Sequence, residues 1–199
     1  MVKSGSAVRD GVFFAVFVST VETLAYPFQS VTYLCESLGL LEAAAYWHQV
    51  IILNDAQQQR LVTRLFREMF NTLANRKIAV FGFAFKADTG DTRESPAAAV
   101  ARLLAEEHAK LQITDPKALE NAKNDLSDLS CAAFTEDPYE AAKGADAVLV
   151  MTPWREYAAL DWRKIYSLMR HPSLVYDAHN ILSAPLLREI GFKVLNTGR

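Results

Sequence analysis

Residues 82–95, Gly-Phe-Ala-Phe-Lys-Ala-Asp-Thr-Gly-Asp-Thr-Arg-Glu-Ser, carry the strongest structural signal in the chain. The preceding residues, Lys77–Phe81, form an apolar run typical of a strand, and the following residues, Pro96–Leu104, have a helical pattern. A strand that leads through a polar loop into a helix is where an α/β domain holds an anionic ligand. The stretch therefore predicts an anion-binding loop with one lysine, Lys86, and one arginine, Arg93.

The remainder of the chain after Arg76 alternates between apolar runs and helical patterns. Strands are expected at Lys77–Phe83, Leu111–Thr114, Ala132–Phe134, Ala147–Met151, Leu174–Tyr176 and Phe192–Leu195. Helices are expected at Pro96–Glu107, Pro138–Lys143, Asp161–Met169 and Ala184–Ile190. The apolar strands have the composition of strands buried on both faces, as in a parallel sheet. This alternation predicts an α/β fold, Rossmann-like and doubly wound, with a mostly parallel sheet.

A long helical arm is expected before the sheet. Residues 29–75 have the apolar spacing of helices, with a break near Gly39 and one amphipathic helix from Leu41 to Leu73. A helix of about thirty residues exceeds the usual globular length of about 8–20 and often bridges two lobes or packs on a second copy. We expect three segments: an irregular one over 1–28, a helical dimerisation region over 29–75, and an α/β domain over 76–199.

The first residues have the charge order of a secretory signal. Lys3 and Arg9 precede the apolar run Val12–Val21, which is shorter than the roughly 20 residues that span a bilayer. A buried strand, or sequence read across an aberrant gene boundary, gives the same pattern.

Composition excludes several classes of protein. The 199 residues carry a net charge of −2, with 51% hydrophobic and 22% charged residues, which is typical of a soluble globular protein without a basic surface for nucleic acid. The two cysteines, Cys35 and Cys131, lack metal-ligand spacing and neighbouring bases. We expect a cytoplasmic protein that binds neither nucleic acid, membrane nor metal.

Four loops at the ends of expected strands are candidates for ligand binding. The first lacks Gly-x-Gly-x-x-Gly, which disfavours ordinary NAD binding by this half of the chain. In that loop Phe85 is suited to pack on a planar ring, Lys86 to present a charge to a phosphate, and Asp91 to pair with Arg93. Lys86 and Arg93 are equally compatible with solvated surface charges.

The other three loops allow both a structural and a functional interpretation. Asp115-Pro116 favours a simple turn over a ligand contact. Trp154 fits either the core or a stack on a ligand. His179, beside Asp177 and Asn180, favours hydrogen bonding within its loop over a role as an acid or phosphate donor.

Residues 82–95 resemble the signature of the UDP-glucose 6-dehydrogenase family in its eukaryotic-type form, a branch of the UDP-glucose/GDP-mannose dehydrogenases. The resemblance continues over roughly residues 28–199. It includes Tyr33–Glu36, Tyr46–Val50, Asn54-Asp55, Thr114–Lys117, Asp137–Ala141, Thr152–Trp154 and Gly191-Phe192.

The resemblance implies a central dimerisation helix and a C-terminal domain that holds the UDP part of a UDP-sugar such as UDP-glucose. The family oxidises that substrate to UDP-glucuronate in two NAD-dependent steps through a cysteine adduct. By this resemblance Phe85, Lys86 and His179 are substrate-binding residues, and Arg93 reaches the NAD held by the other domain. Homo-oligomers, or hetero-oligomers with a full-length enzyme, are the implied partners.

The departures from the family pattern affect the segments that bind the cofactor, supply the nucleophile and contact the substrate. The Gly-x-Gly strand and the Gly-Gly-x-Cys-Phe segment of the nucleophile have no match, and Cys35 matches a helix cysteine, so no catalytic residue is assigned. Asp177-Ala178-His179 replaces Asp-Gly-Arg, which removes a fixed charge and a two-pronged donor. We expect a truncated or diverged dehydrogenase that is inactive alone. The alternatives are a non-catalytic UDP-sugar-binding or regulatory subunit, and one half of a split enzyme.

Overall fold

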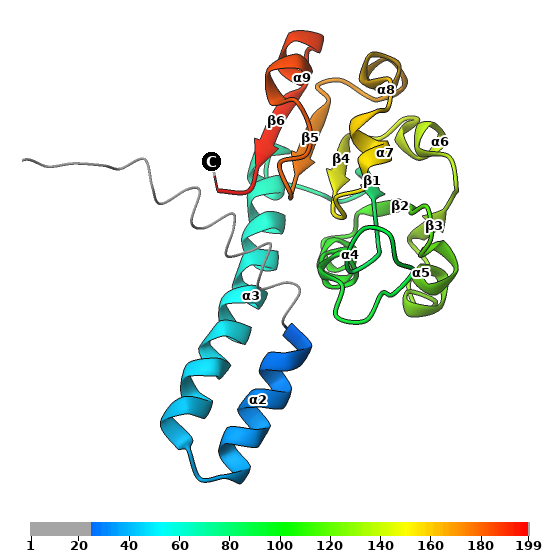
Figure 1. Ribbon diagram of the computed structural model, residues 1–199. Helices are drawn as coiled ribbons and strands as arrows, with labels where there is room; N and C mark the ends of the chain where they lie inside the picture. Colours follow the sequence, from blue (N-terminus) through cyan, green and yellow to red (C-terminus); the bar gives the residue numbers. More distant parts are fainter. Residues whose placement is uncertain (1–24, 199) are drawn as a thin grey trace, which may run out of the picture.

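The computed structural model describes residues 25–198 (Figure 1), so the expectations for residues 1–24 lie outside the described residues. In chain order the elements are α2 (Ala25–Ser37), α3 (Leu41–Glu68), β1 (Lys77–Phe81), α4 (Pro96–Glu106), β2 (Lys110–Thr114), α5 (Leu119–Asp125), β3 (Ala132–Phe134), α6 (Pro138–Ala142), β4 (Ala147–Val150), α7 (Arg155–Ala158), α8 (Trp162–Leu168), β5 (Leu174–Asp177), α9 (Ala184–Ile190) and β6 (Lys193–Asn196).

The strands form one sheet in the order β3-β2-β1-β4-β5-β6, and every neighbouring pair is parallel. This is the doubly wound order of Rossmann-like domains, in which the chain starts in the middle and winds first to one edge and then to the other. The predicted fold class is confirmed. The short helices α5 and α7 are additional to the sequence prediction.

Helices cover both faces of the sheet, which explains why the strands are apolar on both sides. One core contains Leu65 of α3, Leu104 of α4 and alternate strand residues such as Val80 and Leu149. The opposite core contains the other strand residues, such as Val148, together with side chains from α6 to α9. The two cores hold the sheet between the helices on its two faces. The loops that follow the strands form its carboxyl edge.

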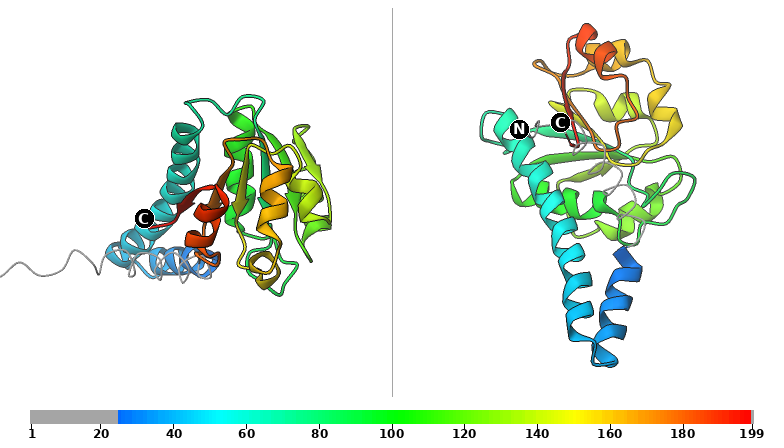
Figure 2. Two further views of the ribbon diagram at one scale, coloured as in Figure 1. Left: turned by 90° about the horizontal axis from the view of Figure 1, so that it is seen from above. Right: turned by 60° about the vertical axis from the view of Figure 1, so that its left-hand side comes forward.

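The helices α2 and α3 form a hairpin that extends away from the sheet (Figure 2). Phe28 and Trp47 stack between the two helices, with ring centroids 4.9 Å apart and planes 21° from parallel. The second half of α3 packs into the sheet domain through Leu61 and Leu65. Large apolar side chains remain exposed on the outer half: Tyr33, Leu34, Leu38, Leu40, Leu41, Tyr46, Ile52 and Leu53. No helix within residues 25–198 is long and apolar enough to cross a bilayer.

Three element ends differ from the sequence prediction by more than one residue. The helix α2 begins at Ala25, inside the segment 1–28 that the sequence indicates as irregular. The strand β1 ends at Phe81 rather than at Phe83, because Gly82 takes a φ of 92° and leaves the extended conformation. The helix α3 ends at Glu68 rather than at Leu73, because Phe70 and Asn71 have φ values of 62° and 58°. The boundary between the second and third segments, at residues 75/76, stays a prediction.

Candidate functional site

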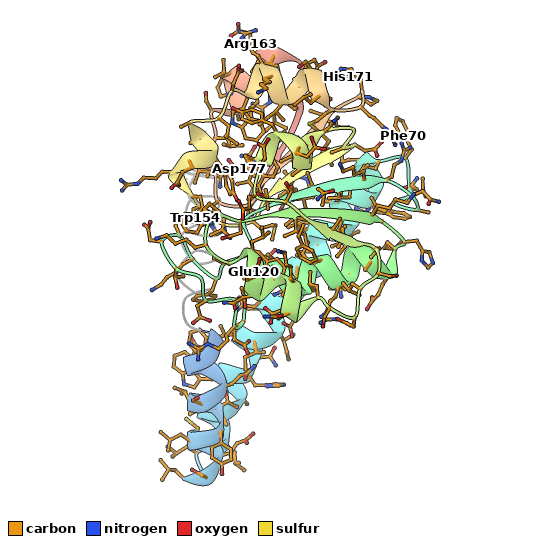
Figure 3. The ribbon with its side chains drawn as sticks, turned by 90° about the vertical axis from the view of Figure 1, so that its right-hand side faces the viewer. Phe70, Glu120, Trp154, Arg163, His171 and Asp177 are labelled. Carbon is orange, nitrogen blue, oxygen red and sulfur yellow. The ribbon has the colours of Figure 1, made fainter. Side chains whose placement is uncertain are left out.

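The candidate loops follow β1, β2, β4 and β5 at the carboxyl edge of the sheet. The strand order reverses between β1 and β4, and sheets of this class bind ligands outside such a switch point. Figure 3 shows Trp154 and Asp177 at this end of the sheet, with Phe70 and His171 at the other end. Residues 82–95 and 151–154 therefore flank the switch point.

Gly82 and Thr152 bring the β1 and β4 loops into direct contact. A Cβ atom on Gly82 would lie 2.5 Å from Thr152 Cβ and 2.7 Å from Thr152 N, so only glycine fits at this position. Thr152 Oγ1 donates a hydrogen bond of 2.7 Å to the carbonyl oxygen of Ala84. Protein atoms thus occupy the start of the crevice between β1 and β4.

The carboxylate of Asp115, at the end of β2, connects three loops. The residue is 3% exposed. Its Oδ2 accepts hydrogen bonds from Phe83 N (2.7 Å), Ala84 N (3.0 Å) and Trp154 Nε1 (3.1 Å). Its Oδ1 accepts from Lys117 N (2.8 Å) and Ala118 N (2.7 Å). The predicted turn is confirmed, but the same side chain also holds the β1 loop and the β4 loop.

Two aromatic side chains complete the packing around Asp115. Trp154 is 1% exposed, so the interpretation of this residue as core is confirmed over a stack on a ligand. Tyr157 donates a hydrogen bond to Thr114 O at 3.1 Å. Burial, and secondarily the charge of Asp115, raises the pKa of Tyr157, which keeps its hydroxyl protonated as the donor.

The loop from Phe85 to Arg93 is closed by short-range bonds. Phe85 N donates to Asp91 O at 2.8 Å, and Arg93 Nη2 lies 2.7 Å from Asp91 Oδ2, which confirms the predicted pair. Hydrogen bonds from the Arg93 side chain and backbone lower the pKa of Asp91 to about 2. Within this closed loop Phe85 is half-buried and Lys86 is exposed. The Arg93 side chain is 83% exposed.

The far end of the same loop rests against the segment that follows β2. Asn121 Nδ2 donates to Gly90 O at 2.7 Å, and Lys117 Nζ lies 3.4 Å from Asp88 O. A Cβ atom on Gly90 would lie 2.9 Å from Lys117 O, which shows how closely the two backbones approach. The sequence offered no signal for Asn121, since a single polar residue on a short helix is typical of a surface.

His179, in the loop after β5, contacts the β4 loop. Its Nε2 lies 2.9 Å from Met151 O and donates the bond, because a carbonyl oxygen only accepts. Its backbone N donates to Asp177 Oδ1 at 3.2 Å. The predicted hydrogen bonding within the loop region is confirmed. The β4 loop is the common neighbour of the β1 and β5 loops.

A pocket of about 110 Å³ lies where α3 passes the start of α4 and the ends of β4 and β5. The described residues that line it are Gln29, Ile51, Asn54, Asp55, Gln57, Gln58, Leu61, Glu94, Pro96, Val100, Met151, Tyr176, Ala178 and Thr197. The predicted site residues Phe85, Lys86, Arg93 and His179 are not among them. They belong to the surface of the loops, outside this pocket.

The UDP-binding domain of the UDP-glucose/GDP-mannose dehydrogenase family matches residues 79–184, which span β1 to the start of α9 and contain all four loops. The chain belongs to the UDP-glucose/GDP-mannose dehydrogenase family.

Relatives within this family are similar over most of the chain. A UDP-glucose 6-dehydrogenase from Caenorhabditis elegans is 45% identical over 177 residues, covering 85% of this chain and 37% of the relative. UDP-glucose 6-dehydrogenase 2 from Arabidopsis thaliana is 43% identical over 189 residues, covering 85% of this chain and 39% of the relative. The chain thus spans 37% to 39% of the length of these curated relatives.

The fold is also found in solved structures of dehydrogenases from this family. A UDP-glucose dehydrogenase from Pyrobaculum islandicum superposes with a TM-score of 0.63 at 24% identity, over 92% of this chain and 50% of that one. A GDP-mannose dehydrogenase from Pseudomonas aeruginosa gives a TM-score of 0.62 at 17% identity, over 87% and 38%. These likenesses support the fold.

The cysteines of this family member lie away from the carboxyl edge. Cys35 is on α2, and Cys131 directly precedes β3, where its carbonyl oxygen accepts from Leu111 N at 2.9 Å. Both are partly exposed. For Cys35 the reason is the position of α2 on the outer hairpin, where one face of the helix is left uncovered by residues 25–198.

The β1 loop of this family member does not fit the pyrophosphate of NAD. Gly82 is the one glycine among residues 82–86, and its Cα faces Thr152 rather than open space. A dinucleotide-binding turn needs several glycines so that the backbone can approach the pyrophosphate.

Proposed function

We propose that residues 25–198 form the UDP-sugar-binding half of a UDP-glucose 6-dehydrogenase. The family match supports a UDP-sugar as the substrate, and the family reaction is an NAD-dependent oxidation. The observation that carries the proposal is the β1 loop, which presents exposed Lys86 beside the switch point. The loop is fixed near its start by the bond from Ala84 N to Asp115 and at its far end by the bond from Asn121 to Gly90 O. A preorganised cation at that position suits a diphosphate.

Each predicted site residue has one part in this proposal. Lys86 binds the diphosphate as a point charge, and half-buried Phe85 packs beside the nucleotide. His179 contributes a donor near the β4 loop, although weakly, because its Nε2 already donates to Met151 O. Arg93, which is 83% exposed and paired with Asp91, is assigned to contact with the cofactor-bearing part of the enzyme.

The oxidation itself requires groups that residues 25–198 do not bring to the carboxyl edge. The β1 loop does not fit NAD, and both cysteines lie elsewhere. On this proposal the nicotinamide site and the nucleophilic thiol come from residues outside these, on the same polypeptide or on another. The 199-residue chain alone is expected to bind UDP and UDP-glucose without reducing NAD.

Isothermal titration calorimetry of the chain with UDP and with GDP tests the proposal. We expect UDP to bind more tightly than GDP, and Lys86→Ala to raise the Kd for UDP about tenfold, since a bond to a charged group contributes about 1.5 kcal/mol or more. Lys110→Ala is the matched control, because Lys110 is an exposed lysine at the opposite edge of the sheet. The absence of UDP binding, or an equal loss in both variants, would contradict the proposal.

His179→Arg tests the assignment in the β5 loop. The substitution restores the fixed charge and two-pronged donor that UDP-glucose dehydrogenases resembling this chain have at this position, so the Kd for UDP should fall several-fold. An unchanged Kd would remove His179 from the substrate site and leave the Lys86 assignment intact.

The exposed side of the hairpin is the proposed oligomer interface. Eight large apolar residues, from Tyr33 to Leu53, lie exposed on α2, α3 and their turn, and such a patch favours association. Light scattering after size exclusion should give a dimer or larger oligomer. Leu34→Asp with Tyr46→Asp should give a monomer with unchanged affinity for UDP. A monomeric unsubstituted chain would count against this part of the proposal.

A further inference from the structure

Asp115 is the residue through which the substrate loop is connected to the rest of the sheet edge. Of the substrate-binding residues proposed above, Phe85 and Lys86 directly follow Ala84. Ala84 N donates to Asp115 Oδ2 at 3.0 Å, while Ala84 O accepts from Thr152 Oγ1 at 2.7 Å. The peptide groups on both sides of Ala84 are therefore held, one from β2 and one from β4.

We infer that Asp115 is a positioning residue for UDP-sugar binding, which sets the β1 loop in its binding conformation without touching the ligand. The inference rests on the proposed function. The residue is 3% exposed, and its two oxygens accept hydrogen bonds from three separate loops. Because the bonds converge on one carboxylate, the β1 loop cannot shift without disturbing the β2 turn and Trp154.

The chemistry of the group explains why aspartate is needed. An ionised carboxylate accepts at both oxygens and donates at neither, and the five groups that form hydrogen bonds with Asp115 are all N–H donors. Asparagine has the same shape, but its amide NH2 would face either the three donors at the Oδ2 position or the two at the Oδ1 position. In both orientations buried N–H groups lose their acceptor.

The segment after Asp115 extends the same support to the far end of the loop. Asn121 donates to Gly90 O at 2.7 Å, and Lys117 Nζ lies 3.4 Å from Asp88 O. The stretch from Asp115 to Asn121 therefore contacts the substrate loop before Phe85 and again before Asp91. A displaced Lys86 binds the diphosphate less tightly, because a charge-assisted hydrogen bond depends on the distance and angle between donor and acceptor.

The test is Asp115→Asn in the full chain, compared with Asp146→Asn. Asp146 is the matched control because it is also buried, accepts from Lys77 N at 2.8 Å and pairs with Arg76 at 3.1 Å, but lies at the amino edge of the sheet. Both variants should melt at lower temperature. The Kd for UDP, measured by calorimetry, should rise about tenfold for Asp115→Asn alone, since the bond from Lys86 to the diphosphate is lost or weakened. Equal affinities in the two variants would overturn the inference.

A spectroscopic readout separates this inference from the proposed function. The chain has three tryptophans, so its ¹H–¹⁵N spectrum should contain three indole N–H signals. Asp115→Asn should shift the Trp154 indole signal and the amide signals of Phe83, Ala84 and Lys86, whereas Asp146→Asn should leave them in place. If these signals shift but the unsubstituted chain does not bind UDP, the proposed function is wrong and the role of Asp115 in holding the loop stands. If the Lys86 and Trp154 signals do not shift in Asp115→Asn, the positioning role of Asp115 is contradicted.

Trp154→Phe keeps the inference testable if Asp115→Asn does not fold. It removes the N–H that bonds Asp115 Oδ2 at 3.1 Å, together with part of a buried ring. The matched control is Trp162→Phe, which removes a buried indole N–H that donates to Tyr157 O at 3.0 Å. We expect the Kd for UDP to rise about threefold for Trp154→Phe and to stay constant for Trp162→Phe. Equal Kd values in these two variants would also overturn the inference.

Discussion

The carboxyl edge of the sheet is held together by polar contacts within the chain, whereas the outer half of the hairpin exposes large apolar side chains. At the edge the loops are joined to one another through buried polar groups, and no described buried side-chain nitrogen or oxygen lacks a partner. On the hairpin, large apolar side chains such as Tyr33 and Leu41 remain exposed. The edge is therefore held by contacts within the chain, whereas residues 25–198 leave the apolar side chains of the outer hairpin uncovered.

The sharpest comparison uses two leucines of the same helix, α3. Leu65 is 0% exposed in the sheet core, and Leu53 is 47% exposed on the hairpin. Leu65→Ala should lower the free energy of unfolding by about 3 kcal/mol or more, because it leaves a cavity among fixed neighbours. Leu53→Ala should change it by less than about 0.5 kcal/mol in a monomer. Urea unfolding measures both.

A second result in the same experiment bears on the hairpin. If Leu53→Ala is costly, and the cost grows with protein concentration, then the hairpin is covered by another copy and contributes stability only in the oligomer. A cost that is independent of concentration would contradict the description of Leu53 as an unsupported surface residue.

The next largest effect is expected at Gly82. Gly82→Ala places a Cβ atom 2.5 Å from Thr152 Cβ at a φ of 92°, so both backbone strain and overpacking apply. We expect a loss of about 2 to 3 kcal/mol on thermal or urea unfolding. Gly144→Ala, at a φ of 67° with no atom within 4 Å of the new Cβ, should lose only about 1 kcal/mol. Equal losses in the free energy of unfolding would show that the β1 and β4 loops can move apart at little cost.

A smaller and local effect is expected where the hairpin begins. Phe28→Ala removes the stack on Trp47, in which the ring centroids are 4.9 Å apart. Hydrogen exchange should accelerate for the amides of α2, corresponding to about 1 kcal/mol of local stability, and stay unchanged in β1 and β4. Faster exchange in the sheet as well would mean that hairpin and edge unfold as one unit.

The smallest effect concerns the pH dependence of the substrate loop. The pKa of Asp91 is lowered to about 2 by Arg93, below the usual value of about 3.9. Its contribution to the stability of the loop is therefore complete above about pH 4 and is lost as the pH falls through about 2. Carboxyl carbon shifts should report this midpoint, and Arg93→Gln should raise it toward 3.9.

A control for this titration is available in the same molecule. Hydrogen bonding to Arg102 lowers the pKa of Asp128, another exposed carboxylate. Arg93→Gln should leave the Asp128 midpoint unchanged. A shift of both midpoints would point to a general change in charge rather than to the loss of the local pair.

The sheet could be predicted from the sequence because strands buried on both faces are continuous apolar runs. Ala147–Val150 and Leu174–Asp177 lie within a residue or so of their predicted ends. The helix α5 could not be predicted in this way, because Leu119 and Ala122 are its only buried residues. It also lacks the proline in the first turn that marks α6 and α9. The end of β1 at Phe81 depends on a contact with Thr152, which is distant in sequence.

The residues of the candidate site could be proposed from the sequence, but not their connections. The pair of Asp91 and Arg93 is local and was predicted. The bond between Trp154 and Asp115 joins positions 39 residues apart and exists only because β1, β2 and β4 are neighbours in the sheet. Local pattern therefore marks which loops are polar, and the strand order decides which of their side chains meet.

The helix α3 has the geometry of a lever. Its 28 residues make a rod of about 42 Å at 1.5 Å per residue. One end is fixed in the sheet core by Leu65, and its middle forms a wall of the pocket through Asn54 and Gln58. A tilt of about 5° at the core would move the hairpin tip by about 3 Å at this rise per residue. A small change of angle at the pocket would therefore produce a larger displacement at the exposed apolar side chains of the hairpin.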